Sequence, residues 1–160
     1  MQPRMDNPAL SVPGALEALQ GLSQAAGEAA RKAGVPETTI DLVSLRASQI
    51  NGCAVCLDMH SRAAIRRGIS PEQLATLAAW RDAPYFDEAE RAVLALTEAG
   101  TRLADRADAV PDELYEAAAK YYDDQGIAAI VTSIAAINAW NRLNVITGQV
   151  AGEWTARWAS

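Results

Sequence analysis

Apolar residues recur at helical spacing along most of the chain. In the segment from Ala15 to Ala33, three leucines stand three positions apart and alanines fill many of the intervals. The next segment, from Pro36 to Ile50, carries apolar residues at steps of 3, 4 and 3, which is the spacing of one face of a helix. Gly34 and Pro36 are residues that commonly end one helix and begin another. The pattern therefore predicts two consecutive helices.

Capping residues mark the beginning of later helices. The segments 70–80 and 87–103 each open with Ser or Asp, followed three positions later by Gln or Glu, which is the pattern of a capping box. A proline followed by two acidic residues predicts the start of a helix over residues 111–122. A mostly apolar run predicts a long last helix over residues 125–146. With a further helical segment at residues 53–67, the chain is expected to hold six or seven helices.

The same pattern defines the fold class. It contains no convincing alternation of period two, no internal repeat and no glycine-rich phosphate loop after a strand. The length of 160 residues suits one domain, and 34 alanines favour helices. We therefore predict an all-α fold in a single domain at residues 13–148. Early prolines predict a flexible N-terminal tail at residues 1–12, and residues 149–160 are expected to form a C-terminal tail.

Charge and hydropathy narrow the classes of partner. Fourteen Lys and Arg residues against twenty Asp and Glu residues give a net charge of −6, so nucleic acid and membranes are not expected partners. The most apolar late stretch, residues 126–137, is much shorter than the roughly 20 residues that a membrane span needs. Residues 1–14 contain no apolar core of a secretory signal. We expect a soluble, cytoplasmic protein.

The two cysteines of the chain, Cys53 and Cys56, form a Cys-x-x-Cys motif, which in a cytosolic protein indicates redox chemistry or metal binding. A helix that begins near Gly52 places Cys53, Cys56 and the single histidine, His60, within about 60° on one face. Free backbone N–H groups at a helix start stabilise a thiolate. His60 is then placed to take the proton of Cys56, and Cys53 to resolve a sulfenic acid on Cys56.

Other interpretations of these residues are open. Cysteine is among the most buried residue types, so both cysteines can be core residues. A structural zinc site needs four ligands, of which Cys53, Cys56 and His60 supply three and Asp41 is the candidate fourth. Three ligands on one helical face do not easily surround a metal tetrahedrally, so no metal is expected. His60 can also be a core histidine without a chemical role.

The segment from Asp41 to Ala63, with the sequence DLVSLRASQINGCAVCLDMHSRA, resembles the core of AhpD-like alkylhydroperoxidases in the carboxymuconolactone decarboxylase superfamily. The similarity continues through Trp80–Pro84, Glu88–Arg91 and Ile137–Asn144, so it covers roughly residues 36–146. It implies an all-helical subunit that assembles into homotrimers or homohexamers. It also implies a thiol peroxidase or disulfide reductase that uses no cofactor, neither haem nor flavin.

The resemblance also implies roles for individual residues. Cys53 matches the first cysteine, Cys56 the second, peroxidatic cysteine, and His60 the histidine of a proton relay. The family's relay glutamate stands twelve residues before the first cysteine, where this chain has Asp41. The aspartate is one C–C bond shorter, about 1.5 Å, a reach that a bridging water can make up. Asp41 is alternatively explained as an acid in the first turn of its helix.

Other residues that match the motif have structural explanations. Buried hydrogen bonds or helix capping explain Arg46, Gln49 and Asn51 equally well. Packing or an interface between subunits explains Trp140, Asn141 and Arg142.

The expected function is a thiol peroxidase that reduces a hydroperoxide substrate. By the same resemblance, a dithiol reductant, either lipoyl groups or a thioredoxin-like partner, restores the cysteine pair. Two other functions remain open: a redox adaptor that passes electrons to a partner peroxidase, and a non-catalytic redox sensor whose disulfide alters its oligomeric state. Decarboxylase relatives lack this cysteine pair, so lactone decarboxylation is not favoured.

Overall fold

The computed structural model describes residues 1–105 and 107–152, and every regular element in these residues is helical. The α-helices are α1 (Pro8–Ser11), α2 (Ala15–Lys32), α3 (Glu37–Asn51), α4 (Ala54–Arg66), α5 (Pro71–Thr76), α6 (Glu88–Thr101), α7 (Asp112–Ala119) and α8 (Asp124–Thr147). Short 3₁₀ segments at Leu77–Asp82 and Leu103–Asp105 follow α5 and α6. The predicted all-α, single-domain fold is confirmed. The described residues hold slightly more helices than predicted, because α1 forms where no helix was expected.

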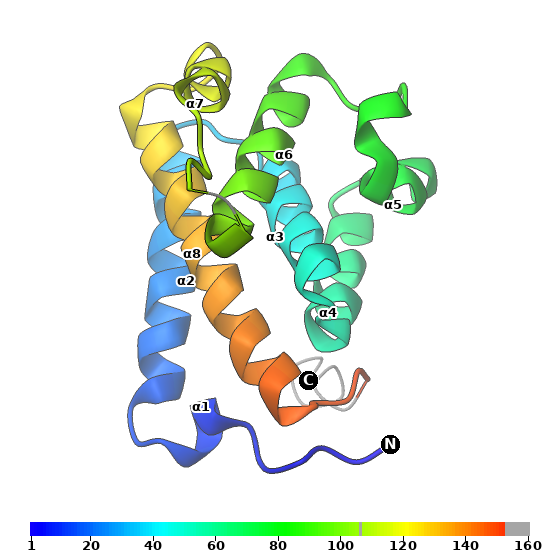
Figure 1. Cartoon of the computed structure of the whole chain (residues 1–160), viewed down its shortest axis with the longest axis vertical. Helices are drawn as coiled ribbons and strands as arrows, with labels where there is room; N and C mark the ends of the chain where they lie inside the picture. Colours follow the sequence, from blue (N-terminus) through cyan, green and yellow to red (C-terminus); the bar gives the residue numbers. More distant parts are fainter. Residues whose placement is uncertain (106, 153–160) are drawn as a thin grey trace.

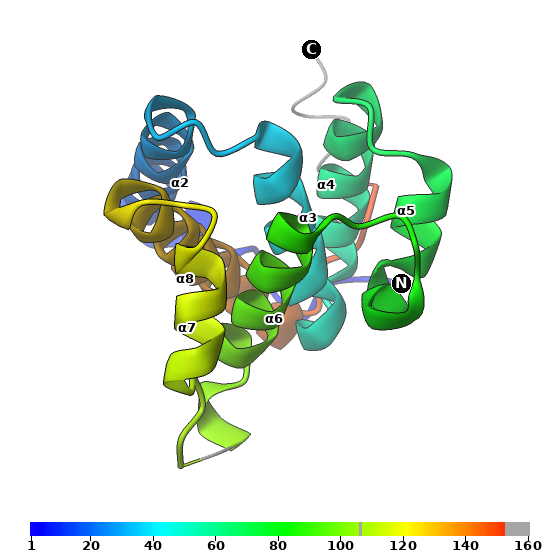
Figure 2. The ribbon, with the colours of Figure 1, turned by 90° about the horizontal axis from the view of Figure 1, so that it is seen from above.

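Helix α3 is the centre of the structure. It packs against α8, α4 and α6, and α8 in turn packs along α2, as Figures 1 and 2 show from two directions. Seven of the eight residues in the run from Asp41 to Ser48 are buried, so α3 is covered on nearly all sides. A helix enclosed in this way can hold functional side chains firmly in place.

Apolar side chains pack in two main clusters that share α3. Val43 belongs to a cluster with residues of α6 and α8, including Val93 and Ile130. Leu42 and Leu45 belong to a second cluster on the side of α4 and α5. Both clusters anchor α3, and the second also holds α4, which carries the cysteine motif.

Both predicted capping boxes are present. The N–H of Gln73 donates to Oγ of Ser70 at 3.1 Å, and the N–H of Ser70 donates back to Oε1 of Gln73 at 3.3 Å. Asp87 and Glu90 make the equivalent pair of bonds at 2.8 and 3.0 Å. The beginnings of α5 and α6 are therefore fixed by local side chains, as the sequence indicated.

The helix that begins with the first capping box ends earlier than predicted. Instead of continuing to Trp80 as an α-helix, the chain changes to 3₁₀ turns after Thr76. The guanidinium of Arg91, on α6, donates to four main-chain carbonyl oxygens in or just after these turns, those of Trp80, Arg81, Ala83 and Phe86. A side chain from α6 thus donates to carbonyl groups at the end of the 3₁₀ segment and in the loop that follows it.

Residues 4–7, expected to belong to a flexible tail, lie against the C-terminal end of α8, and the short helix α1 that follows packs against α2 (Figure 1). The N–H of Arg4 donates to the carbonyl oxygen of Thr147 at 2.8 Å. The side-chain amide of Asn7 caps α1 and donates to Oδ1 of Asn144 at 2.6 Å. These contacts are polar, so the spacing of apolar residues could not indicate them.

Most of the predicted C-terminal tail, residues 153–160, lies outside the described residues. Within residues 1–105 and 107–152, no helix combines the length and the apolar character needed to cross a membrane.

Candidate active site

The turn between α3 and α4 sets the position of both cysteines. Gly52 ends α3 with a φ of 68°, a left-handed conformation that glycine adopts readily. Cys53 follows as the N-cap of α4, and its Sγ accepts the N–H of Cys56 at 3.4 Å. The helix therefore begins at Ala54, slightly later than the predicted start near Gly52. Cys53 occupies a capping position, and Cys56 lies in the first turn of the helix.

The two thiols are buried and share their hydrogen bonds. Cys53 and Cys56 are 1% and 4% exposed, and neither is in a disulfide. Hydrogen bonds from the thiol and then the backbone N–H of Cys56 lower the pKa of Cys53 to about 6, despite burial. The same thiol–thiol bond, together with burial, raises the pKa of Cys56. Because the two thiols share a hydrogen bond, they titrate together, and the first proton to leave belongs to the pair and not to one sulfur alone.

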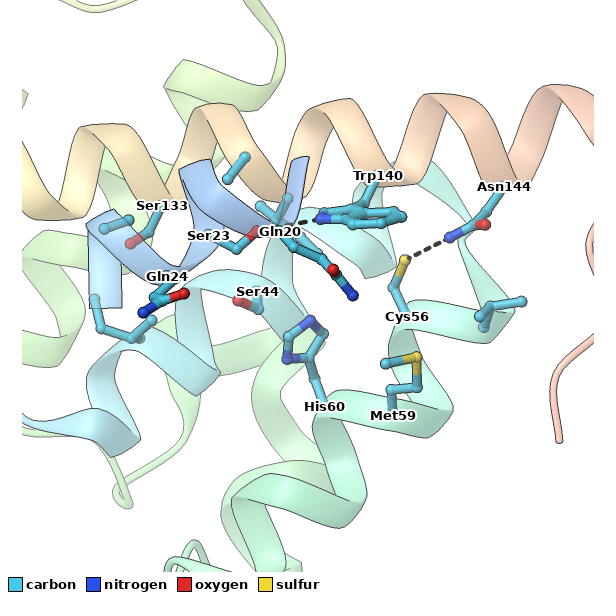
Figure 3. A pocket seen from close by; sticks show the side chains of 15 residues that line it. Gln20, Ser23, Gln24, Ser44, Cys56, Met59, His60, Ser133, Trp140 and Asn144 are labelled. Carbon is cyan, nitrogen blue, oxygen red and sulfur yellow. Dashed lines mark hydrogen bonds between the residues drawn. The ribbon is translucent and has the colours of Figure 1, made fainter. Parts of the chain in front are cut away.

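A cavity of about 550 Å³ opens beside Cys56, between α2, α3, α4 and α8 (Figure 3). Cys56, Met59 and His60 project into it from α4, while Trp140 comes from α8. Polar but uncharged side chains complete part of the wall, namely Gln20, Ser23, Gln24, Ser44 and Ser133. Among the described residues, no Asp, Glu, Lys or Arg lines the cavity, so it is suited to an uncharged, largely apolar molecule.

His60 lines the same cavity one helical turn after Cys56. Figure 3 shows its ring directed towards Ser44, whereas Cys56 is directed towards Asn144. Burial, and then the positive charge of Arg67, lower the pKa of His60 to about 4, so its imidazole is neutral at pH 7. In the part of the chain that the structure describes, no hydrogen bond joins His60 to Cys56.

The structure places Asp41 on Arg67. Nη1 of Arg67 donates to both carboxylate oxygens of buried Asp41, at 2.9 and 3.0 Å, and Nε of Arg67 donates to Glu37 at 2.9 Å. Burial raises the pKa of Asp41, although the charge of Arg67 acts in the opposite direction. Asp41 does not line the cavity, and the described residues show no hydrogen bond between it and His60. Arg67 therefore affects both residues through its charge.

The structure thus brings Cys53, Cys56 and His60 together and leaves Asp41 outside the cavity wall. Within the described residues, no group of three or more His, Cys, Asp or Glu side chains is placed to hold a metal ion. The zinc alternative therefore has no ligand cluster among these residues.

The other motif residues make partly buried hydrogen bonds. Nε of Arg46 donates to Glu98 at 2.7 Å, and its Nη1 donates to Gln49 at 3.0 Å. The amide of Asn51 donates to two asparagines of α8, Asn138 at 3.0 Å and Asn141 at 2.9 Å. These contacts fit the structural explanation given for the motif residues.

Sequence reasoning missed the wall that α2 contributes. Nε1 of Trp140 donates to Oγ of Ser23 at 3.2 Å, which ties α2 to α8 across the cavity. It also missed Asn144, whose amide lies against the cysteines. The available signal was the series of asparagines at 138, 141 and 144, polar residues that share one face of a mostly buried helix.

Among solved structures, the chain is similar to a protein of unknown function from Agrobacterium tumefaciens, ATU0492, described as a candidate antioxidant defence protein AhpD. The two share 33% identity with a TM-score of 0.83, over 94% of this chain and 98% of that one. The debrominase Bmp8 in complex with 2,3,4-tribromopyrrole has 20% identity and a TM-score of 0.77, over 92% of this chain and 75% of that one. The first likeness defines an AhpD-like helical protein, and the second concerns the fold alone.

The sequence model of the Carboxymuconolactone decarboxylase family matches residues 13–99. The uncharacterized protein YdfG of Bacillus subtilis (strain 168) is 35% identical over 121 residues, which are 76% of this chain and 81% of YdfG. The uncharacterized protein YnjA of Escherichia coli (strain K12) is 31% identical over 103 residues, 64% of this chain and 55% of YnjA. The chain therefore belongs to the carboxymuconolactone decarboxylase family, in agreement with the predicted AhpD-like resemblance.

Proposed function

We propose that this protein is a thiol peroxidase that reduces organic hydroperoxides with the Cys53–Cys56 pair. The observation that carries the proposal is the unequal placement of the two sulfurs. Cys56 lines the cavity, while Cys53 is not part of its wall and is hydrogen-bonded to Cys56. One thiol is thus open to substrate and the other is positioned to resolve the product. The likeness to a candidate antioxidant defence protein AhpD supports the same function.

The first step is attack on the peroxide. The hydrogen-bonded pair loses its first proton more readily than a free thiol does, so the two sulfurs can share one negative charge and one thiol proton. Transfer of this proton to Cys53 leaves a Cys56 thiolate at the cavity. Its sulfur attacks the terminal oxygen of the hydroperoxide, the O–O bond breaks, and Cys56 becomes a sulfenic acid. The released alkoxide takes one proton from solvent and leaves as an alcohol.

The second step forms the disulfide. The sulfur of Cys53 attacks Sγ of the Cys56 sulfenic acid, and the departing hydroxide takes the thiol proton of Cys53 to leave as water. In total, one thiolate, one thiol, one hydroperoxide and one proton give one disulfide, one alcohol and one water. The hydroperoxide is reduced and the two sulfurs are oxidised.

A dithiol reductant then restores the pair. Because Cys56 lines the cavity, the incoming thiolate is expected to attack Sγ of Cys56 and release Cys53. The second thiol of the reductant then attacks the mixed disulfide and releases Cys56. The reductant leaves as a disulfide. Lipoyl groups or a thioredoxin-like protein would serve as such a reductant.

His60 and Asp41 have supporting roles in this proposal. The neutral imidazole of His60 lies in the cavity and can hydrogen-bond the bound hydroperoxide or its leaving oxygen. Asp41 acts through Arg67, whose charge lowers the pKa of His60. Asp41 is thus a positioning residue, and its link to His60 is electrostatic.

The test is consumption of cumene hydroperoxide and hydrogen peroxide by the purified protein, with dihydrolipoamide or dithiothreitol as the reductant. The Cys56→Ser variant is the matched control because it changes one atom of the reactive side chain. Turnover by the wild type and none by Cys56→Ser is expected. Equal turnover by both proteins would overturn the proposal.

The same assay separates the other two functions. A redox adaptor would show a readily reducible Cys53–Cys56 disulfide without peroxide turnover unless a partner peroxidase is added. A redox sensor would show no turnover but a change of molecular mass by light scattering on oxidation. The homotrimer or homohexamer implied by the family resemblance would be measured in that experiment.

A further inference from the structure

The side-chain amide of Asn144, on α8, lies against both sulfurs of the cysteine pair. Its Nδ2 is 3.3 Å from Sγ of Cys56 and 3.7 Å from Sγ of Cys53 (Figure 3). Asn144 is 6% exposed, so water competes little for these bonds. An amide N–H can only donate, and a negatively charged sulfur accepts such a bond more strongly than a neutral thiol does.

The direction of this amide decides its effect. If the oxygen of Asn144 faced the sulfurs, its lone pairs would repel a thiolate. Asn7 prevents this, because its Nδ2 donates to Oδ1 of Asn144 at 2.6 Å. Asn7 is oriented in turn by the backbone N–H of Ala9, which donates to Oδ1 of Asn7 at 2.9 Å. A backbone N–H is always a donor, so the direction of the whole series is fixed from the main chain to the sulfur.

The N-terminal segment that carries Asn7 is held by other contacts as well. Arg4 donates through its backbone N–H to Thr147 and through Nη1 to the carbonyl oxygen of Ile146, at 2.8 and 2.7 Å. Nε2 of Gln149 donates to the carbonyl oxygen of Met5 at 2.9 Å. The attachment of the segment and the direction of the Asn144 amide can therefore be changed separately.

We infer that Asn144 is a catalytic hydrogen-bond donor that stabilises negative charge on Sγ of Cys56, and that Asn7 is the positioning residue that directs its amide. The attack on peroxide requires that the negative charge of the pair be transferred to Sγ of Cys56. The shorter of the two amide contacts is the one to Cys56, which favours this transfer. The stabilisation of the Cys56 thiolate by Asn144 does not depend on the proposed function. Only the use of that thiolate to attack peroxide rests on it.

The experiment reads the ionisation of Cys56 directly. In the full chain carrying Cys53→Ser, Cys56 is the only thiol, and serine keeps the capping position of α4. The rate of alkylation by iodoacetamide is measured against pH, with mass spectrometry of the peptide that contains Cys56. Asn144→Ala removes the donor, and Asn7→Ser keeps the cap of α1 but has no amide to reach Asn144. Both variants are neutral, so neither places a new charge near the sulfur.

Asn144→Ala is expected to raise the midpoint of the alkylation profile by about one pH unit, which corresponds to a roughly tenfold lower rate at pH 7. Asn7→Ser is expected to raise it by at least about half a unit. Gln149→Ala is the matched control, because it weakens the attachment of the same segment without touching the Asn144 amide, and it should leave the midpoint unchanged. Asn144→Leu, which has a similar volume and no donor, provides a second measurement if the alanine variant does not fold.

Unchanged midpoints in folded Asn144→Ala and Asn144→Leu would overturn the role of Asn144. A shift in Gln149→Ala as large as that in Asn7→Ser would overturn the role of Asn7. Alkylation needs no peroxide, so the expected shifts in a protein without peroxidase activity would support this inference while the proposed function fails.

Discussion

One nitrogen of Arg67 donates to both carboxylate oxygens of Asp41, at 2.9 and 3.0 Å. This contact occupies the carboxylate that the family resemblance assigns to a proton relay with His60. Burial is the larger cause of the lowered pKa of His60, and the charge of Arg67 lowers it further. Arg67 thus binds Asp41 directly and acts on the cavity histidine through its charge.

Replacing Arg67 by glutamine is expected to raise the pKa of His60 from about 4 towards its ordinary value of 6.5, without reaching it, because burial is the larger cause. His60 is the only histidine of the chain, so NMR of its ring protons against pH gives an unambiguous titration. Arg62→Gln, which removes the partner of Asp58 on the same helix, is the control. An unchanged pKa of His60 in Arg67→Gln would show that the charge of Arg67 does not act on His60.

His60 is expected to make stability fall in mild acid. Its folded pKa of about 4 lies below the unfolded value of 6.5, so the unfolded chain binds the proton first as the pH decreases. The contribution of the neutral His60 to the stability of the folded protein is therefore complete above pH 6.5 and is lost as the pH falls to 4. Between pH 7 and pH 5 the loss should be at most about 2 kcal/mol.

Urea unfolding of the wild type and of His60→Gln at pH 7 and pH 5 measures this effect. The variant has no titrating ring, so its free energy of unfolding should change less between the two pH values. Equal changes in both proteins would contradict the assigned pKa.

A buried cluster around Glu98 is expected to contribute to stability without acting on the thiols. Its carboxylate accepts hydrogen bonds from Trp80 and Arg46 and pairs with Arg81, and these bonds outweigh burial and lower its pKa. Glu98→Gln should reduce the free energy of unfolding by about 1–3 kcal/mol. The exposed Glu17→Gln is the control and should change it by less than about 0.5 kcal/mol. Faster or slower alkylation of Cys56 in Glu98→Gln would show that the cluster also affects the site.

Trp140 is expected to select large substrates. Trp140→Ala removes an aromatic wall of the cavity, so the KM for cumene hydroperoxide should rise about tenfold. Hydrogen peroxide is too small to need that wall, so its rate constant should not change. Ser23→Ala, which removes only the hydrogen bond to Trp140, is the matched control. An equal loss of rate with both peroxides would show instead that Trp140 supports the cysteines.

The sequence predicted the parts of the structure that depend on local information. The capping boxes at 70–73 and 87–90, and the placement of Cys56 and His60 on one helix, follow from neighbouring residues. The contacts of Arg91 with the end of the 3₁₀ segment could not be predicted in this way, because Arg91 belongs to another helix.

Polar contacts between residues far apart along the chain could not be predicted from the sequence either. Asn7 and Asn144 are 137 positions apart, and Arg67 is 26 positions from Asp41. Helical periodicity indicates which face of a helix is buried. It does not indicate which polar group from another segment contacts that face. The same limit applied to the first cysteine, because the capping position of Cys53 depends on where α4 begins.

The proposed reaction begins when Sγ of Cys56 attacks the peroxide. The most direct test treats reduced Cys53→Ser and Cys56→Ser with one equivalent of cumene hydroperoxide in the presence of dimedone, which traps sulfenic acids, followed by mass spectrometry. We predict a dimedone adduct on Cys56 in the first variant and none on Cys53 in the second. An adduct on Cys53 in Cys56→Ser, with none on Cys56 in Cys53→Ser, would contradict the account.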